Sequence, residues 1–115
     1  MTLNFPSSAA HSVEAKRRLL LNLRPVPDLD RWVRLVAPCA GGFSGEVVGT
    51  ALSGEDEALL RFLRESGSLR LDRVERVTDL DGAARLWAGA TAAIGMRLHF
   101  AVLTALRDAA RRVAL

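Results

Sequence analysis

The segment Ser68–Ala84, SLRLDRVERVTDLDGAA, decides the fold of this 115-residue chain. Its first part, residues 69–72, alternates between leucine and charged side chains, which predicts a half-buried strand. The apolar spacing then breaks at residues 73–76, and this break predicts a bend. The following Asp79–Asp81 predicts a turn in which Asp81 caps the next helix by accepting hydrogen bonds from free backbone N–H groups.

After this turn the chain alternates again between helix and strand signals. A helix is predicted to end at Gly95, because apolar residues before it recur at helical spacing: Leu86, Trp87, Ala90, Ala93 and Ile94. Met96–Leu103 alternates between apolar and other residues and predicts a strand, after which Thr104 caps a last amphipathic helix. The same residues also fit a 3.6-residue period, so a continued helix is the alternative for Met96–Leu103.

Before the segment, Ser53–Ser66 has the features of a helix. Ser53 is a natural N-cap, Asp56 stands at the third helical position, and Gly67 predicts a left-handed stop. The acidic residues of the first turn suit the helix dipole. They are explained without a metal ion.

A β-hairpin is predicted further upstream. Trp32–Pro38 and Glu46–Leu52 are rich in β-branched residues, and glycines follow Cys39 in the connection between them. Cys39 has no histidine near it in sequence. We therefore interpret it as an inert loop or core thiol rather than a nucleophile.

Residues 1–29 are predicted to be a helical extension and a proline-containing linker. A helix is expected to run to about Leu23, and Pro25 and Pro27 end it. This extension either docks on the core, which we favour, or binds a partner. Residues 30–115 then form an α/β domain, a small mixed four-stranded sheet covered by helices.

The composition limits the function classes. The formal charge is +3, but the basic residues are spread along the chain beside acidic ones, and there is no tyrosine. Nucleic-acid binding therefore is not indicated. A single cysteine and the lack of a signal-peptide pattern predict a cytoplasmic location. Arg97 and His99 interrupt the apolar stretch from residue 86 to 106, which argues against a membrane span.

The order of elements and the central turn resemble a STAS domain, the α/β module of anti-sigma-factor antagonists and related proteins. Leu71–Val77 is similar to the family's strand, and Asp81–Ala84, DGAA, stands where the family has a "DSAG" or "DSSG" helix start. The segment from Gly49 to Leu52 is similar to the family's "GELD" corner. The resemblance covers about residues 31 to 115.

The resemblance implies a non-enzymatic regulatory module that docks on a protein partner through Asp79–Ala84 and the following helix. The implied contact residues are Asp79, Asp81, Gly82, Ala83, Ala84 and Arg85. The partner would be an anti-sigma-type kinase, a stressosome-like assembly or a transporter ATPase subunit, and a homodimer is a further option. Gly82 replaces the family's phosphorylated hydroxyl residue, so docking without a phosphorylation switch is expected. No cofactor, metal site or catalytic residue is expected.

Two alternatives remain. GEVVGTALSGEDEALLRFL, residues 45–63, is similar to the second half of acylphosphatases, but the N-terminal residues lack their phosphate-binding loop and arginine. His11 and His99 have no spaced partners for metal binding or acid-base chemistry. The other alternative is a helical adaptor that self-associates through Ala88–Ala93, which requires Met96–Leu103 to be helical.

Overall fold

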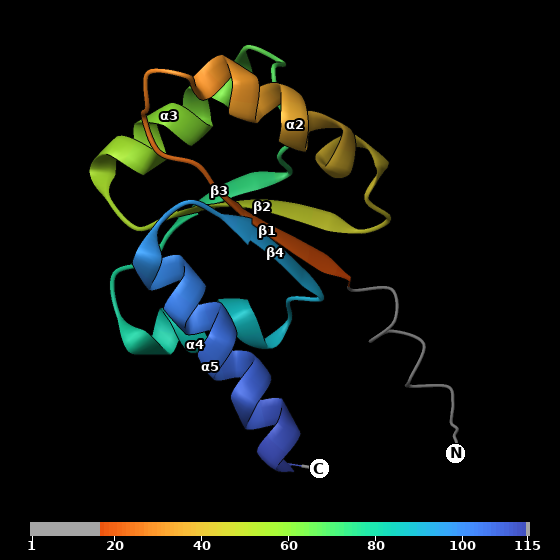
Figure 1. The fold of residues 1–115 in the computed structure, drawn as a ribbon, viewed down its shortest axis with the longest axis vertical. Helices are drawn as coiled ribbons and strands as arrows, with labels where there is room; N and C mark the ends of the chain where they lie inside the picture. Colours follow the sequence, from red (N-terminus) through yellow and green to blue (C-terminus); the bar gives the residue numbers. More distant parts are fainter. Residues whose placement is uncertain (1–16, 115) are drawn as a thin grey trace.

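The computed structural model describes residues 17–114, and it describes their side chains except those of Leu98, His99 and residues 109–114. This part of the chain forms a four-stranded sheet and four helices (Figure 1). The elements are β1 (Arg18–Asn22), α2 (Leu29–Gly42), β2 (Glu46–Ala51), α3 (Gly54–Glu65), β3 (Arg73–Arg76), α4 (Leu80–Ala88), β4 (Ala92–Gly95) and α5 (Leu98–Ala114). The predicted fold class, an α/β sheet covered by helices, is confirmed.

The strands lie in the order β3-β2-β1-β4, and all three pairings are parallel. Each strand is followed by a helix that returns the chain to the same end of the sheet, which is the connection that parallel strands need. Helices α2 and α3 cover one face of the sheet, and α4 and α5 cover the other (Figure 1). Starting from β1, the chain first adds β2 and β3 on one side of β1. After α4, it adds β4 on the other side of β1.

Strand β1 corrects the prediction of a helix running to Leu23. Leu19 and Leu21 pack in the core beneath α2 and α3, whereas Leu20 packs in the second core with α4 and α5. A central parallel strand is buried on both faces and is therefore continuously apolar, so it gives no alternation to distinguish it from a helix. Residues 18–22 belong to the sheet, and residues 1–16 of the expected extension lie outside the described residues.

Helix α2 corrects the prediction of a hairpin. Trp32–Pro38 is helical, and α2 buries Val36 and Ala40 against the sheet. The β-branched residues favour a strand only weakly, and packing on the sheet outweighs this preference even with Pro38 inside the helix. The strand predicted at Glu46–Leu52 is confirmed as β2.

Residues 69–72 do not form the predicted strand; the strand of this region is β3, at Arg73–Arg76. Leu69 and Leu71 are buried, as expected, but in a connection that Arg64 holds by donating from Nε to the Leu71 carbonyl at 2.9 Å. The strand β3 begins at Arg73, where a bend was predicted. Burial of alternate side chains therefore identified a core segment but not its hydrogen-bonding pattern.

The C-terminal predictions also change. Helix α4 ends at Ala88 rather than at Gly95, and Ala92–Gly95 forms β4. The strand predicted at Met96–Leu103 is wrong, because α5 begins at Leu98 and includes Thr104, the predicted cap. Gly95 is the last residue of β4, and an added Cβ there would overlap the ring of Phe100.

Helix α3 is confirmed with its expected ends. The Ser53 hydroxyl accepts a hydrogen bond from the Asp56 N–H at 3.2 Å, which places Ser53 at the N-cap. Gly67 follows the helix with φ of +75°, the left-handed conformation that glycine adopts readily.

Candidate functional site

The predicted docking turn lies at the start of α4. Asp79 is the N-cap: its backbone is extended, and its Oδ1 accepts a hydrogen bond from the Gly82 N–H at 2.7 Å. Asp81 is the second residue of the helix and is exposed, so the prediction that Asp81 caps α4 is wrong. The reason is spacing, because a cap bonds the N–H two or three residues after it, and α4 begins at Leu80.

This correction predicts different effects for the two aspartates. Replacing Asp79 with alanine leaves the Gly82 N–H without its acceptor and should lower the free energy of unfolding by about 1 kcal/mol. Asp81→Ala removes only an interaction with the helix dipole and should cost less. Urea unfolding of both variants measures the difference. An equal or larger loss for Asp81→Ala would contradict the assignment of the cap.

The residues predicted to form one docking surface lie on two sides of α4. Leu80, Ala83 and Ala84 line a groove between α4 and α5, and Asp79 lies at its end. Gly82 and Arg85 instead line a polar pocket between α4 and the sheet. Positions three and four apart share one side of a helix, which separates these two groups. The structure therefore divides the predicted site.

The groove consists of two adjoining pockets of about 380 and 470 Å³, which share Leu80, Ala83, Leu103 and Leu106. Large apolar side chains are exposed along it: the exposed fraction is 79% for Leu80, 60% for Leu106 and 44% for Val102. Singly exposed apolar residues are normal, but a contiguous set marks an interaction surface. We call this surface the α4–α5 groove.

The base of the α4–α5 groove is rigidly packed. Trp87 makes an edge-to-face contact with Phe100, with ring centroids 5.2 Å apart. The Trp87 indole Nε1 donates to the Thr104 hydroxyl at 2.9 Å, and that hydroxyl donates to the Phe100 carbonyl at 3.0 Å. These contacts join α4 to α5 at the base of the groove.

Half of this groove was missed from the sequence. Val102, Leu103 and Leu106 come from α5; a strand was predicted at Val102 and Leu103, whereas Leu106 was predicted in the last helix. The signal that identifies them is the 3.6-residue period of the apolar residues from residue 98 onward, which was the alternative interpretation.

A second cluster of polar side chains lies at the carboxyl ends of the strands. Asn22 ends β1, Asp56 lies in the first turn of α3, and Arg97 precedes α5; Asn22 and Asp56 are fully buried. Arg97 contacts both carboxylate oxygens of Asp56, with Nε 3.1 Å from Oδ1 and 3.0 Å from Oδ2, and Nη2 2.8 Å from Oδ1. We call these three residues the carboxyl-edge cluster.

Asn22 completes the carboxyl-edge cluster. Its Nδ2 donates to Asp56 Oδ2 at 3.1 Å and to the Thr50 carbonyl at 2.9 Å. Its Oδ1 accepts from the backbone N–H groups of Met96 at 3.3 Å and Arg97 at 3.0 Å. The cluster thus ties β1, β2, α3 and the start of α5 together.

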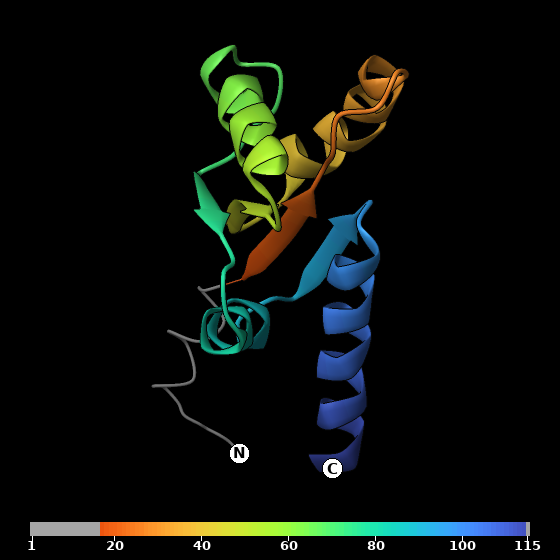
Figure 2. The ribbon, with the colours of Figure 1, turned by 90° about the vertical axis from the view of Figure 1, so that its left-hand side faces the viewer.

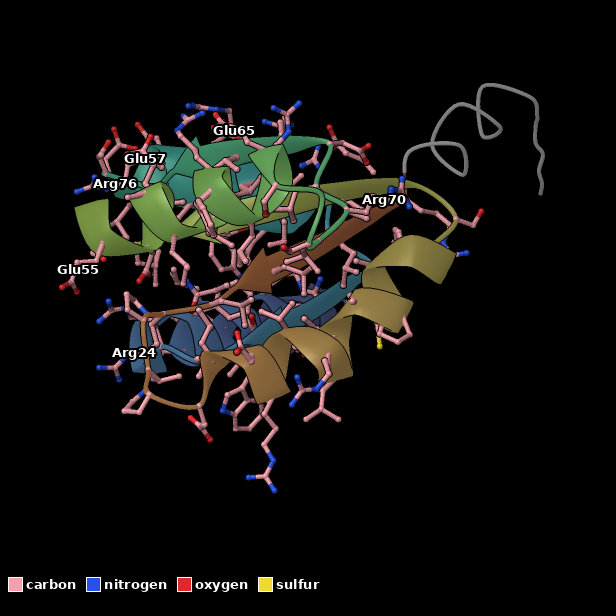
Figure 3. The ribbon with its side chains drawn as sticks, turned by 90° about the horizontal axis from the view of Figure 1, so that it is seen from above. Arg24, Glu55, Glu57, Glu65, Arg70 and Arg76 are labelled. Carbon is pink, nitrogen blue, oxygen red and sulfur yellow. The ribbon has the colours of Figure 1, made fainter. Side chains whose placement is uncertain are left out.

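The environment keeps Asp56 and Arg97 charged. Burial alone would raise the pKa of Asp56, but hydrogen bonds from Arg97, Asn22 and the Leu52 N–H outweigh burial, and the pKa lies below its usual value of 3.8. The hydrogen bond with Asp56 likewise raises the pKa of Arg97. Figure 3 shows further charged residues at this end of the sheet: Arg24, Glu55, Glu57 and Arg76.

Residues considered for catalysis do not gather here. Cys39 is exposed on α2 rather than in a loop. The side chain of His99 and all of His11 lie outside the described part of the chain. Among described residues, no group of three or more His, Cys, Asp or Glu side chains has an arrangement that could hold a metal ion.

No helix within the described residues is long and apolar enough to cross a membrane. Comparison of the chain with family models, curated proteins and solved structures found no match.

Proposed function

We propose that this chain is a protein-interaction domain that binds an amphipathic helix of a partner protein in the α4–α5 groove. The observation that carries the proposal is the exposure of Leu80, Val102 and Leu106 along one groove between two helices. A partner that covers these side chains removes apolar surface from water, at about 25 cal/mol for each Å².

A helix is the partner element that suits this surface. Two helices that diverge from a packed base leave a trough, and an amphipathic helix fits such a trough with apolar residues at every third or fourth position. Figure 2 shows α5 extending past the sheet, and the α5 residues that line the groove are Val102, Leu103, Leu106 and Arg107. The exposed Asp81 and the cap Asp79 lie at the α4 end, where a basic residue of the partner would gain from the negative charge.

The regulatory role implied by the STAS resemblance is part of this proposal. We propose a cytoplasmic module that docks without catalysis. The absence of a phosphorylation switch is supported by Gly82, which has no hydroxyl group at the start of α4. A kinase, a stressosome-like assembly or a transporter subunit are the partner classes that the resemblance implies. Self-association into a homodimer through the same groove is an alternative use of the surface.

The experiment that tests this function is site-specific photo-cross-linking in cells. A photo-reactive phenylalanine analogue at position 106 should cross-link to one partner, and sequencing of the linked peptide should give an amphipathic segment. The same analogue at Leu35, which is 61% exposed on α2, is the matched control and should give no such product. Equal products from both positions, or none from position 106, would contradict the proposal.

A second candidate function is binding of a small molecule at the carboxyl ends of the strands. The observation that favours it is the strand order. Strands β2 and β3 lie on one side of β1, and β4, which follows them in the chain, lies on the other side of β1. Ligands of open α/β sheets bind at such a reversal point. Arg24 and Arg97 follow these two strands, and Arg97 leads into the N-terminus of α5, which favours an anionic ligand.

A further inference from the structure

A strip of alternating charges lies on the face of the sheet that α4 and α5 cover. Arg18 pairs in register with Glu46, and these residues precede Leu20 and Val48 by two positions. Leu20 and Val48 pack in the core with α4 and α5, and strand side chains two apart share a face. Arg18 and Glu46 therefore lie on the face of the sheet that α4 covers.

Strand β3 extends the same strip. Val74 packs on the opposite face with the core under α2 and α3, so Arg73 and Glu75 face α4. Glu46 accepts from Arg18 Nε at 2.9 Å on one oxygen and from Arg73 Nε at 2.9 Å on the other, and Arg73 Nη1 also bonds Glu75. The hydrogen bond from Arg73 is the largest cause that lowers the pKa of Glu46; burial opposes it, and the bond from Arg18 adds to it.

The strip forms the floor of a pocket of about 210 Å³, and α4 forms its wall. Its lining residues are Arg18, Arg73, Glu75, Gly82, Arg85 and Leu86. Three guanidinium groups thus face one lining carboxylate. The pocket is smaller than the 300–1,000 Å³ that is usual for drug-sized ligands, which limits the occupant to a small molecule or ion.

The arginines keep free donors for such an occupant. Arg18 uses its Nε for Glu46 and its Nη1 for the Leu86 carbonyl, at 3.2 Å. Arg73 uses Nε and Nη1. The side chain of Arg85 is exposed and makes no hydrogen bond or ion pair with the other described residues. Since each guanidinium has five N–H donors, most donors of the three side chains remain available.

We propose that this pocket binds the phosphate group of a small molecule. Several arginine forks around one concave surface suit the oxygens of a phosphate, which accept bidentate, charge-assisted hydrogen bonds. Glu75 limits the affinity through its own negative charge. Arg85 is the residue that contributes a charge not already balanced by a carboxylate.

The pocket is independent of the α4–α5 groove. It opens on the side of α4 that carries Gly82 and Arg85, whereas Leu80 and Ala84 line the groove. Loss of phosphate binding therefore leaves the proposed partner binding intact, and the two proposals fail separately.

Isothermal titration calorimetry of the full chain at low ionic strength tests the proposal, with inorganic phosphate and glycerol 3-phosphate as probes. We expect saturable binding of at least one probe and about a tenfold or larger loss of affinity in Arg85→Gln. Glu75→Gln should bind more tightly than the natural sequence. Equal affinity for both probes identifies free phosphate as sufficient, and tighter binding of glycerol 3-phosphate identifies a phosphate ester.

The matched control is Arg61→Gln on α3, whose arginine is exposed and pairs with Glu57 four residues earlier. This variant removes the same charge from the other side of the sheet and should bind phosphate as the natural sequence does. Absence of saturable binding to either probe, or equal weakening by Arg61→Gln and Arg85→Gln, would overturn the proposal. Circular dichroism of each variant verifies that the fold is kept.

Discussion

The Asp56→Ala variant should lose about 3–5 kcal/mol of unfolding free energy, a large part of the 5–15 kcal/mol typical of a domain. The carboxylate of Asp56 is fully buried and is the charge partner of Arg97. Its removal leaves the guanidinium of Arg97 without that partner, and it leaves the Asn22 amide without one acceptor. Urea unfolding at neutral pH measures the loss.

The matched control is Glu57→Ala, in the next position of the same helix. Glu57 is paired with Arg61 at 3.0 Å on the exposed side of α3, where ion pairs contribute little. Its unfolding midpoint should stay close to that of the natural sequence. Similar losses for Glu57→Ala and Asp56→Ala would show that the effect comes from removing an acidic side chain from the first turn of α3 rather than from the carboxyl-edge cluster.

Acid should reproduce part of this loss. Because folding lowers the pKa of Asp56, the folded state holds the proton less tightly than the unfolded chain does. The contribution of Asp56 to stability is therefore complete above the unfolded value, near 3.9, and is lost as the pH falls through the lower folded value. Asp56→Asn should show a weaker fall in stability than the natural sequence as the pH is lowered from about 5 through the acid range. An unchanged slope would contradict the shift.

The Leu80→Asp variant should weaken partner binding by about tenfold to a hundredfold. Leu80 lies where the two pockets of the α4–α5 groove meet, and a carboxylate there would lose water when an apolar partner surface covered it. Since Leu80 is 79% exposed in the free domain, its replacement should change stability little. Calorimetry with the cross-linked partner segment measures the affinity.

Leu35→Asp is the control for Leu80→Asp, because it places the same charge on a similarly exposed leucine of α2, on the other face of the sheet. It should bind the segment as tightly as the natural sequence. If Leu35→Asp and Leu80→Asp weakened binding equally, a general effect of negative charge would explain the result and the groove would not.

Local signals predicted some elements of the fold well. Helix α3 has its cap at Ser53 and its stop at Gly67, so short-range chemistry alone determines its ends. Strand β2 is identified by β-branched residues, and the corner before α4 is identified by its aspartates and glycine. Only the identity of the cap, Asp79 rather than Asp81, required the backbone conformation.

The central strand could not be predicted in the same way. Leu19, Leu20 and Leu21 are buried on both faces, and the resulting apolar run is equally consistent with a helix. Strand β4, Ala92–Gly95, is short and rich in alanine, which favours a helix by propensity. Both strands form because neighbouring parallel strands pair with them, and these partners lie far away in the sequence.

The candidate sites depend on similar long-range contacts. Asp56 was interpreted only as part of the first helical turn, although its carboxylate pairs with Arg97, 41 residues away. The groove likewise needs α5 beside α4 before Leu80 and Leu106 become neighbours. The sequence could indicate the α4 half of this surface, but not the side of the helix on which it lies.

The most direct test of the proposed docking function is a titration of the isotope-labelled domain with the cross-linked partner segment, followed by backbone amide NMR shifts. The perturbed amides should gather on α4 and on residues 100–107 of α5, and Leu80→Asp should remove these changes. Perturbations on α2 and α3, or around Arg24 and Arg97 at the carboxyl ends of the strands, would contradict the proposed docking function.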